Sequence, residues 1–397
     1  MSVAAIVAEY NPFHKGHAYQ LEKTKQAGFE QVVAVMSGNF VQRAEPALMN
    51  KHARAKAAVK NGVDLVIELP TPWATAGAMF FARGAIHLLG SLGFVDTISF
   101  GSESGDTKLV KKAARAVDCA SVNSGLIGEL MAQGNSFARA RALVVESLFG
   151  PQIAQVLASP NDNLALEYVR AAETLGLHFD FLATKRKGAG HDQAGIFEGF
   201  ASASQIRQNV ALGESIEALL PAASYEVFKE EFENFRASAD YKKLEAAVLY
   251  ALRSKTAADI AKVPDISEGI ENRIHFAASQ AVSLEDLFEK AKAKRYSHAR
   301  IRRIVLHAFL GIEASQTEGL PPYIRILAIG DGGKSLLKQA AQSAKLPLVM
   351  RAADVKGLDE KSKALFALES RATDIYNISL PKILPSGSDY RAEIFVS

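Results

Sequence analysis

Two histidines three residues apart, His14 and His17, follow an apolar run and an Asn-Pro turn near the start of the chain. This order predicts a buried strand over residues 3–8, a tight turn, and a helix that begins close to the histidines. The free amides and the dipole of a helix N-terminus attract anions, and imidazoles there can donate to phosphate oxygens as charge develops on them. Gly16 between them permits a close approach of the backbone. The spacing therefore predicts a phosphate site that serves catalysis.

Two other interpretations of the histidine pair compete with this one. A solvated helix start would leave both imidazoles in water without a function. A zinc site would need further ligands, and the sequence has no cysteine or third histidine near the pair at ligand spacing. The strand and turn before the pair favour the phosphate site.

Composition limits the class of protein. The chain has 397 residues, a formal net charge of +3 and one cysteine, Cys119. The length predicts two or three domains, and a single cysteine excludes an internal disulfide framework. The apolar run at the N-terminus is too short for a signal peptide or a membrane span. We therefore expect a cytoplasmic protein without membrane attachment, in which the small net charge does not by itself indicate nucleic acid.

Strands and helices alternate along the first hundred residues. Strands are expected over 3–8, 31–36, 63–69 and 97–100, with helices over 17–27, 50–60 and 76–92. This alternation predicts a Rossmann-like α/β domain with a parallel sheet and right-handed crossovers. Ligands bind at the carboxyl ends of such strands. Side chains that follow the predicted strands, His14, Ser37, Gly38 and Gly101, should therefore meet at one edge of the sheet.

The remainder of the chain is expected to be mostly helical. Helices are predicted over 106–150 and 163–175, a fifth strand over 177–184, and a connection at 188–190. Further helices extend from residue 213 to about 314, and strands are possible at 324–329 and 346–350. We divide the chain into a catalytic domain, 1–215, and a mainly helical C-terminal region, 216–397.

Further segments could bind anions or a small substrate. Ser204 lies at a predicted helix start with Arg207 one turn later, and Arg186 follows the fifth strand between two lysines. Free helix amides and a guanidinium both suit phosphate. A pocket for a small substrate is predicted after the second strand, from Ser37, Gly38, Gln42 and Arg43. A capped helix and solvated turns are the structural alternatives.

Charged residues indicate two more partners. Residues 290–303 contain seven Lys or Arg and no acidic residue. On a helix, Tyr296, Arg300, Arg303 and His307 would form an outward stripe suited to an RNA backbone, although such a run can also be a solvated face. Three carboxylates expected near strand ends, Glu9, Glu103 and Asp106, could hold Mg²⁺ with ATP phosphates.

Several phrases of the sequence together resemble the bacterial tRNA(Met) cytidine acetate ligases. They are AEYNPFHKGH at 8–17, VMSGNFVQR at 35–43, DLVIELP at 64–70, FGSE at 100–103, SPN at 159–161, TKR at 184–186, KRY at 294–296 and PYIR at 322–325. The resemblance covers essentially the whole chain. The histidine motif alone is shared with nucleotidyltransferases and class I aminoacyl-tRNA synthetases.

The resemblance implies a two-step reaction. ATP would activate acetate to acetyl-adenylate, and the acetyl group would pass to N4 of the wobble cytidine of elongator tRNA(Met), giving N4-acetylcytidine. An adenylyltransferase acting on a phosphorylated metabolite and an RNA-binding protein without catalysis are the alternatives.

The same resemblance, joined to the motifs above, assigns the site residues. His14 and His17 are expected to be catalytic, and Mg²⁺ is expected with ATP. The expected ATP-binding residues are Val7, Glu9, Tyr10, Asn11, Pro12, Phe13, His14, Gly16, His17, Gln20, Gly101, Asn161, Arg186, Ser204 and Arg207. The residues expected to bind tRNA are Lys294, Arg295, Arg300 and Arg303.

Overall fold

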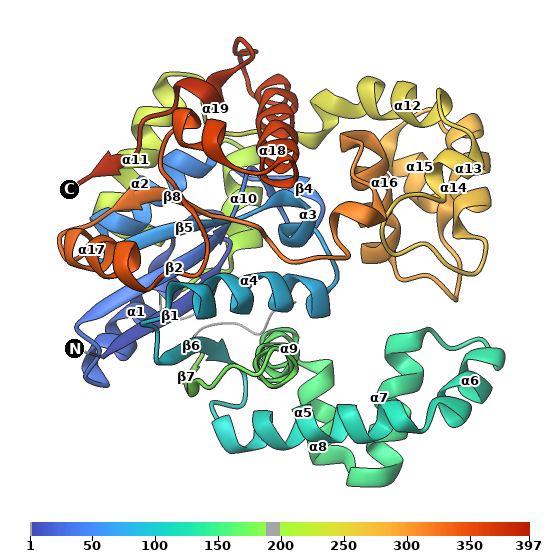
Figure 1. The fold of residues 1–397 in the computed structure, drawn as a ribbon. Helices are drawn as coiled ribbons and strands as arrows, with labels where there is room; N and C mark the ends of the chain where they lie inside the picture. Colours follow the sequence, from blue (N-terminus) through green and yellow to red (C-terminus); the bar gives the residue numbers. More distant parts are fainter. Residues whose placement is uncertain (1, 188–198) are drawn as a thin grey trace.

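One mainly parallel sheet organises the structure, a computed structural model that describes residues 2–187 and 199–397 (Figure 1). The strand order is β10-β8-β5-β2-β1-β6-β7, with β9 paired to β8. The adjacent strands β5, β2, β1, β6 and β7 all run parallel to one another, whereas β8 runs antiparallel to β5. The strands are β1 Val3–Ala8, β2 Gln31–Ser37, β5 Leu65–Leu69, β6 Thr97–Ser102, β7 Asp180–Lys185, β8 Ile324–Ile329, β9 Leu348–Val349 and β10 Phe395–Val396. The predicted α/β class is confirmed, and the connection predicted at 188–190 lies outside the described residues.

Helices cover both faces of the sheet because successive strand side chains point to opposite faces. On β1, Val3 and Ala5 pack toward one helical layer, and Ile6 packs toward the other. The first layer contains α4 Ala78–Leu92, α5 Thr107–Val122 and α9 Pro160–Thr174. The second contains α1 Lys15–Gln26, α2 Lys51–Lys60 and α11 Ala222–Glu233. The central strands are thus buried on both sides, as their continuous apolar sequences require.

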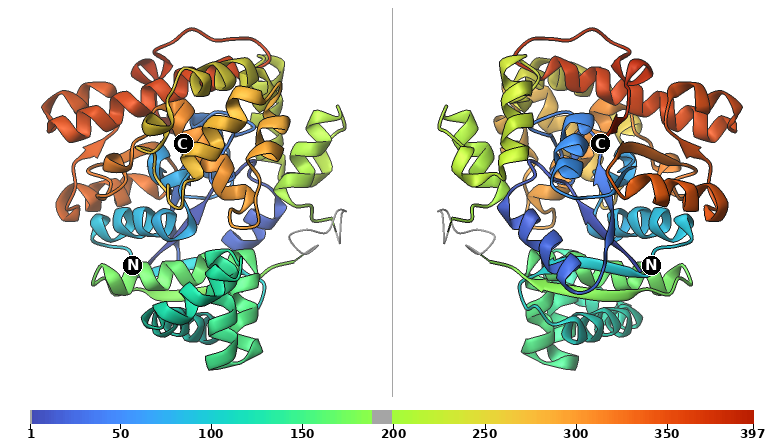
Figure 2. Two further views of the ribbon diagram at one scale, coloured as in Figure 1. Left: turned by 90° about the vertical axis from the view of Figure 1, so that its right-hand side faces the viewer. Right: turned by 90° about the vertical axis from the view of Figure 1, so that its left-hand side faces the viewer.

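Two groups of helices extend beyond the sheet, above and below its right-hand end in Figure 1. The lower group continues from α5 through α6 Ser124–Ala132, α7 Phe137–Phe149 and α8 Pro151–Ala158. The upper group has its own apolar core and contains α12 Glu245–Arg253, α13 Ala257–Ile260, α14 Ile270–Gln280, α15 Leu284–Ala291 and α16 His298–Leu310. Figure 2 shows that both groups lie at the same end of the sheet.

The end of the chain returns to the sheet through β8, β9 and β10, with α17 Gly333–Ser343, α18 Glu360–Ile378 and α19 Ser388–Arg391 beside them. Residues from both sides of the boundary predicted near residue 215 therefore share one sheet, and that boundary stays a prediction. In the described part of the chain, no helix has the length and apolar character needed to cross a membrane.

The strand order determines where a ligand can enter. Strand β1 has β2 on one side and β6 on the other. The helix after β1 packs on one face of the sheet, whereas the helix after β6 packs on the other. The two loops therefore separate at the carboxyl ends of these strands and leave a crevice between them.

Candidate active site

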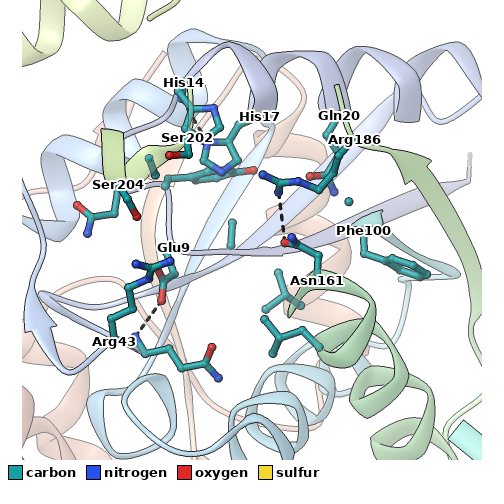
Figure 3. A pocket seen from close by; sticks show the side chains of 18 of the residues that line it. Glu9, His14, His17, Gln20, Arg43, Phe100, Asn161, Arg186, Ser202 and Ser204 are labelled. Atoms are coloured by element: carbon teal, nitrogen blue, oxygen red, sulfur yellow. Dashed lines mark hydrogen bonds between the residues drawn. The ribbon is translucent and has the colours of Figure 1, made fainter. Parts of the chain in front are cut away.

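A pocket occupies this crevice, and a smaller hollow adjoins it (Figure 3). Twelve of the residues expected to bind ATP line the pocket: Val7, Glu9, Tyr10, Asn11, His14, His17, Gln20, Gly101, Asn161, Arg186, Ser204 and Arg207. Gly16 lines the hollow. Pro12 and Phe13 are outside both sets, and Phe13 is a fully buried ring beside Tyr10 and His17. The structure thus brings together residues that are up to 200 positions apart in the chain.

His14 and His17 form a reciprocal cap at the start of α1. Nδ1 of His14 accepts from the Gly16 N–H at 3.0 Å, and Nδ1 of His17 accepts from the His14 N–H at 3.2 Å. The two rings stack with their centroids 3.8 Å apart. Because both Nδ1 atoms accept hydrogen bonds, a neutral ring carries its proton on Nε2. Each histidine therefore offers an Nε2–H donor to a ligand.

The electrostatics of the pocket keep both imidazoles neutral. Burial, together with the charges of Arg186 and Arg207, lowers the pKa of His14 to about 3. Burial, His14 and Arg186 hold the pKa of His17 well below its usual value of 6.5. Both rings are thus uncharged hydrogen-bond donors at neutral pH. Positive charge at the site comes from arginines.

One of these arginines lies one turn beyond a second helix N-terminus. Helix α10, Ala203–Ala211, is capped by Ser202, whose side chain accepts from the Gln205 N–H at 3.2 Å. One turn later, Arg207 donates to the Asn11 carbonyl at 3.0 Å and to the Glu45 carboxylate at 3.0 Å. These two bonds fix the guanidinium beside the loop after β1. Free amides and a fixed cation together suit a phosphate chain.

The other arginine belongs to a chain of hydrogen bonds on the opposite side of the pocket. Arg186 donates to Oδ1 of Asn161 at 3.3 Å, and Nδ2 of Asn161 donates to Glu103 at 2.6 Å. Glu103 also accepts from the Asp162 N–H at 3.0 Å, while Asp162 accepts from the Ser104 N–H at 3.0 Å. The Glu103 and Asp162 carboxylates therefore connect the loop after β6 to the start of α9.

These contacts bear on the expected magnesium ligands. Glu103 caps α9, and Asp106 caps α5 by accepting from the Lys108 and Leu109 amides at 2.8 and 3.1 Å. Across residues 2–187 and 199–397, no three His, Cys, Asp or Glu side chains gather in a way that could hold a metal ion. Glu103 and Asp106 are thus engaged with backbone N–H groups at the starts of two helices.

The expected substrate pocket is only partly formed by the predicted residues. Gln42 and Arg43 line the pocket. Ser37 and Gly38, at the end of β2, do not line the pocket, which differs from the prediction. Their carbonyls instead accept from the guanidinium of the fully buried Arg54. A Cβ at Gly38 would come within 2.8 Å of a Glu68 carboxylate oxygen. These two small residues therefore allow close packing of the loop.

An apolar wall of the pocket was missed by the sequence analysis. It is formed by Phe81, Phe100, Leu164 and Tyr168, from α4, β6 and α9. Phe100 belongs to the FGSE phrase at 100–103, but the types and spacing of the other three residues predict only a core position. Their role in the site follows from tertiary packing alone.

The predicted basic stripe is wrong in part. Helix α16 begins at His298, so Tyr296 precedes it, is buried, and donates to the Glu268 carbonyl at 2.7 Å. His307 is also buried and lies 2.8 Å from the Thr75 hydroxyl. Arg300 and Arg303 are half-buried and bind Asp265 at 3.3 and 3.1 Å. The helix begins after the first residue of the predicted stripe, and the loop that contains Asp265 and Glu268 covers Tyr296, Arg300 and Arg303.

Buried neutral histidines predict a pH dependence of stability. Burial and the charge of Arg303 lower the pKa of His307 to about 3, so the folded protein keeps this ring neutral while the unfolded chain protonates it below about pH 6.5. The free energy of unfolding should therefore fall by about 1 kcal/mol for each such histidine between pH 7.5 and 5.5. Urea unfolding at both pH values measures this, and His307→Gln should reduce the fall. An equal fall in both proteins would contradict the prediction.

Comparisons with known proteins agree on one family. The profile described as HIGH Nucleotidyl Transferase matches residues 1–389. The chain is 35% identical over 398 residues to the tRNA(Met) cytidine acetate ligase of Thermoanaerobacter sp. (strain X514), covering 98% of each chain. It is 38% identical over 382 residues to that of Caldicellulosiruptor saccharolyticus, covering 95% of this chain and 94% of the relative.

Solved structures give the same result. Thermotoga maritima TmcAL in its apo form I has a TM-score of 0.93 and 31% identity, and the match covers 100% of this chain and 99% of that one. The same protein bound with alpha-thio ATP has a TM-score of 0.91, 31% identity and the same coverage.

Proposed function

The chain belongs to the tRNA(Met) cytidine acetate ligase family, and from this premise we propose how its pocket carries out the reaction. An oxygen of acetate attacks the α-phosphorus of ATP, and pyrophosphate leaves. N4 of the wobble cytidine in elongator tRNA(Met) then attacks the acetyl carbon, and AMP leaves. The product is N4-acetylcytidine. We place this reaction in the cytoplasm, where ATP and tRNA are both available.

The observation that carries the proposal is the set of donors around one pocket. Two Nε2–H groups, from His14 and His17, lie at the start of α1, and Arg207 lies one turn into α10. Negative charge grows on the α-phosphate as acetate attacks, and fixed donors stabilise that charge without reorganising. The arginine is suited to the β- and γ-phosphates, which become the leaving pyrophosphate.

Adenylation also explains why acetate needs this site. Acetate is a poor acyl donor because direct displacement would expel an oxide, whereas acetyl-adenylate expels AMP. Holding acetate beside the α-phosphate supplies much of the remaining acceleration. Gln42 and Arg43 border the pocket and are the proposed acetate ligands.

We propose that Mg²⁺ enters with ATP. Its main ligands would be phosphate oxygens and water, which is the usual arrangement for this ion in nucleotide sites. The bound ion would neutralise phosphate charge, while His14, His17 and Arg207 would position the phosphates.

The hollow beside the pocket is the proposed entry for the tRNA. The Tyr19 and Phe200 rings meet edge to face with their centroids 6.1 Å apart. Lys187 and Lys23 lie 4.7 and 5.7 Å from the Tyr19 ring centre. Aromatic rings beside lysines suit a single-stranded loop whose bases are unstacked, as the anticodon loop must be for its cytidine to reach the pocket.

The basic segment before α16 gives a prediction for tRNA affinity. Lys294 and Arg295 are exposed, unlike the Asp265-bound Arg300 and Arg303, so they keep the role in tRNA binding that the sequence suggested. The double variant Lys294→Glu and Arg295→Glu should weaken tRNA(Met) binding by about tenfold and reduce its salt dependence. Filter binding at two salt concentrations measures both effects.

A matched control uses the same charge change elsewhere. Lys334 and Lys338 are exposed on α17, at the far end of the molecule from α16 in Figure 1. Their double reversal to Glu should leave tRNA affinity nearly unchanged. Equal losses in the two double variants would show that only overall charge matters and would contradict a local contact.

The proposed function is tested by incubating the protein with ATP, labelled acetate and an unmodified tRNA(Met) transcript. Label should enter the transcript as N4-acetylcytidine, and a transcript with uridine at the wobble position should stay unlabelled. The alternative, an adenylyltransferase for a phosphorylated metabolite, predicts no label in either transcript.

A further inference from the structure

The second step of the proposed reaction requires a proton acceptor. The N4 amine of cytosine is a weak nucleophile, and its nitrogen must lose one proton when it becomes an amide. A positioned side chain that removes this proton accelerates such a step by about 10²–10⁴-fold. The identity of this proton acceptor is inferred on the basis of the proposed function.

Most polar groups of the pocket are unsuited to accept a proton. The Nδ1 atoms of His14 and His17 already accept backbone N–H groups, which leaves each ring with an Nε2–H donor. Burial raises the pKa of the Tyr10 and Tyr168 hydroxyls, so both remain protonated at neutral pH. The arginines are permanently charged donors. Of the described residues that line the pocket and its adjoining hollow, Glu9 alone carries a carboxylate.

Glu9 is held in place at one side of the pocket. It follows the last residue of β1, and its Oε1 accepts from the Gln42 N–H at 2.9 Å. Its backbone carbonyl accepts from the Arg54 guanidinium, which also fixes the loop below. Figure 3 shows Glu9 beside Arg43, across the cavity from Asn161 and Arg186 and below the two histidines. One carboxylate oxygen of Glu9 is thus held by a hydrogen bond, and the side chain borders the same pocket as His14, His17 and Arg207.

The charges around Glu9 come from several elements. Arg207 on α10 and Arg43 after β3, Phe40–Val41, favour its ionised form, and Glu45 on β4, Glu45–Pro46, opposes it. The buried Arg54 on α2 and the phenol of Tyr168 on α9 also interact with it. Burial outweighs the favourable contacts and raises the pKa of Glu9 above 4.5, which makes its carboxylate a stronger base than a solvated glutamate.

We propose that Glu9 is the general base of acetyl transfer. N4 of the wobble cytidine forms a bond to the carbonyl carbon of acetyl-adenylate, and its proton passes to the Glu9 carboxylate. The bond between that carbon and the phosphate oxygen breaks, and AMP leaves with the electron pair. Glu9 then returns its proton to solvent when the products leave.

The test separates the two half-reactions in the variant Glu9→Gln. A glutamine oxygen can still accept from the Gln42 N–H, so the loop contact is kept while the base is lost. Acetyl-adenylate is supplied directly, and a single turnover of transfer to tRNA(Met) is followed with rapid quench. We expect transfer to fall at least 100-fold, and acetate-dependent ATP–pyrophosphate exchange to fall much less.

The pH profile and a conservative variant provide the second readout. Wild-type transfer should slow toward acid pH as Glu9 takes up a proton, and this acid limb should be absent from Glu9→Gln. Glu9→Asp should recover part of the rate together with the limb. Glu173→Gln removes an exposed carboxylate near the end of α9, outside the pocket lining, and it should leave transfer close to the wild-type rate.

The outcomes distinguish the two proposals. Wild-type transfer rates in Glu9→Gln would overturn the assignment of the base. Equal losses of exchange and transfer would also overturn it, because Glu9 would then act on ATP or on the fold. Failure of the wild-type protein to activate or transfer acetate would instead refute the proposed function.

Discussion

His17→Ala is expected to reduce acetate-dependent ATP–pyrophosphate exchange by about 10³-fold, which is the upper range for loss of one transition-state donor. The variant removes the Nε2–H of His17 and also leaves the His14 N–H without its side-chain acceptor. The position of the neighbouring His14 donor should therefore suffer as well. Exchange measured at saturating ATP and acetate reports the effect on the adenylation step alone.

A control histidine separates this effect from a general loss of stability. His87 on α4 is half-buried and lies 3.2 Å from the Pro321 carbonyl, and it does not line the pocket or the hollow. His87→Ala should retain most of the exchange activity. tRNA(Met) binding by His17→Ala should be nearly intact, since the proposed tRNA contacts are the Tyr19 and Phe200 rings with their lysines, and Lys294 and Arg295. Normal exchange by His17→Ala would exclude the proposed phosphate site.

Arg54→Leu is expected to lower the free energy of unfolding by at least ~3 kcal/mol. Arg54 has no exposed surface, and its guanidinium donates to the carbonyls of Met49, Glu9, Ser37 and Gly38. Burial lowers its pKa to about 10, so it remains charged at neutral pH. Leucine has a similar apolar stem but would leave these carbonyls without their donor.

Urea unfolding measures this loss, and Arg253→Leu provides a matched control. Arg253 also donates to two carbonyls, of Ala278 and Ala281, at 3.1 and 2.6 Å, but its side chain is exposed. Water can replace its hydrogen bonds, so the loss there should be about 1 kcal/mol or less. Equal losses in the two variants would contradict the role of Arg54 as the residue that joins the loops after β1 and β2.

Much of the fold could be predicted because local patterns and tertiary structure agree. The strand over 3–8 and the helix after it carry their own signals, namely an apolar run, an Asn-Pro turn and the histidine pair. That His14 and His17 act as a capping box was less evident, since this arrangement usually uses Ser or Thr with Glu. The antiparallel placement of β8 depends on contacts across more than 250 residues, and no local pattern encodes it.

The residues of the candidate site could likewise be predicted only where a local sequence motif marks them. Residues in motifs, such as Asn161 and Arg186, could be assigned from the sequence, and the structure places them within hydrogen-bond distance. The apolar wall with Phe81 and Tyr168 could not, because a pocket-lining aromatic residue and a core aromatic residue have the same pattern. The stripe on α16 failed for another reason. Tyr296 lies before the helix, and Asp265 approaches from another loop and forms ion pairs with both Arg300 and Arg303.

ATP–pyrophosphate exchange by the wild-type protein, with and without acetate and in the absence of tRNA, tests the central claim most directly. Carboxylate adenylation predicts that labelled pyrophosphate enters ATP only when acetate is present. If acetate gives no exchange, the assay is repeated with tRNA(Met) added, so that a requirement for bound tRNA is also covered. The absence of acetate-dependent exchange under both conditions would contradict acetyl-adenylate formation at this pocket.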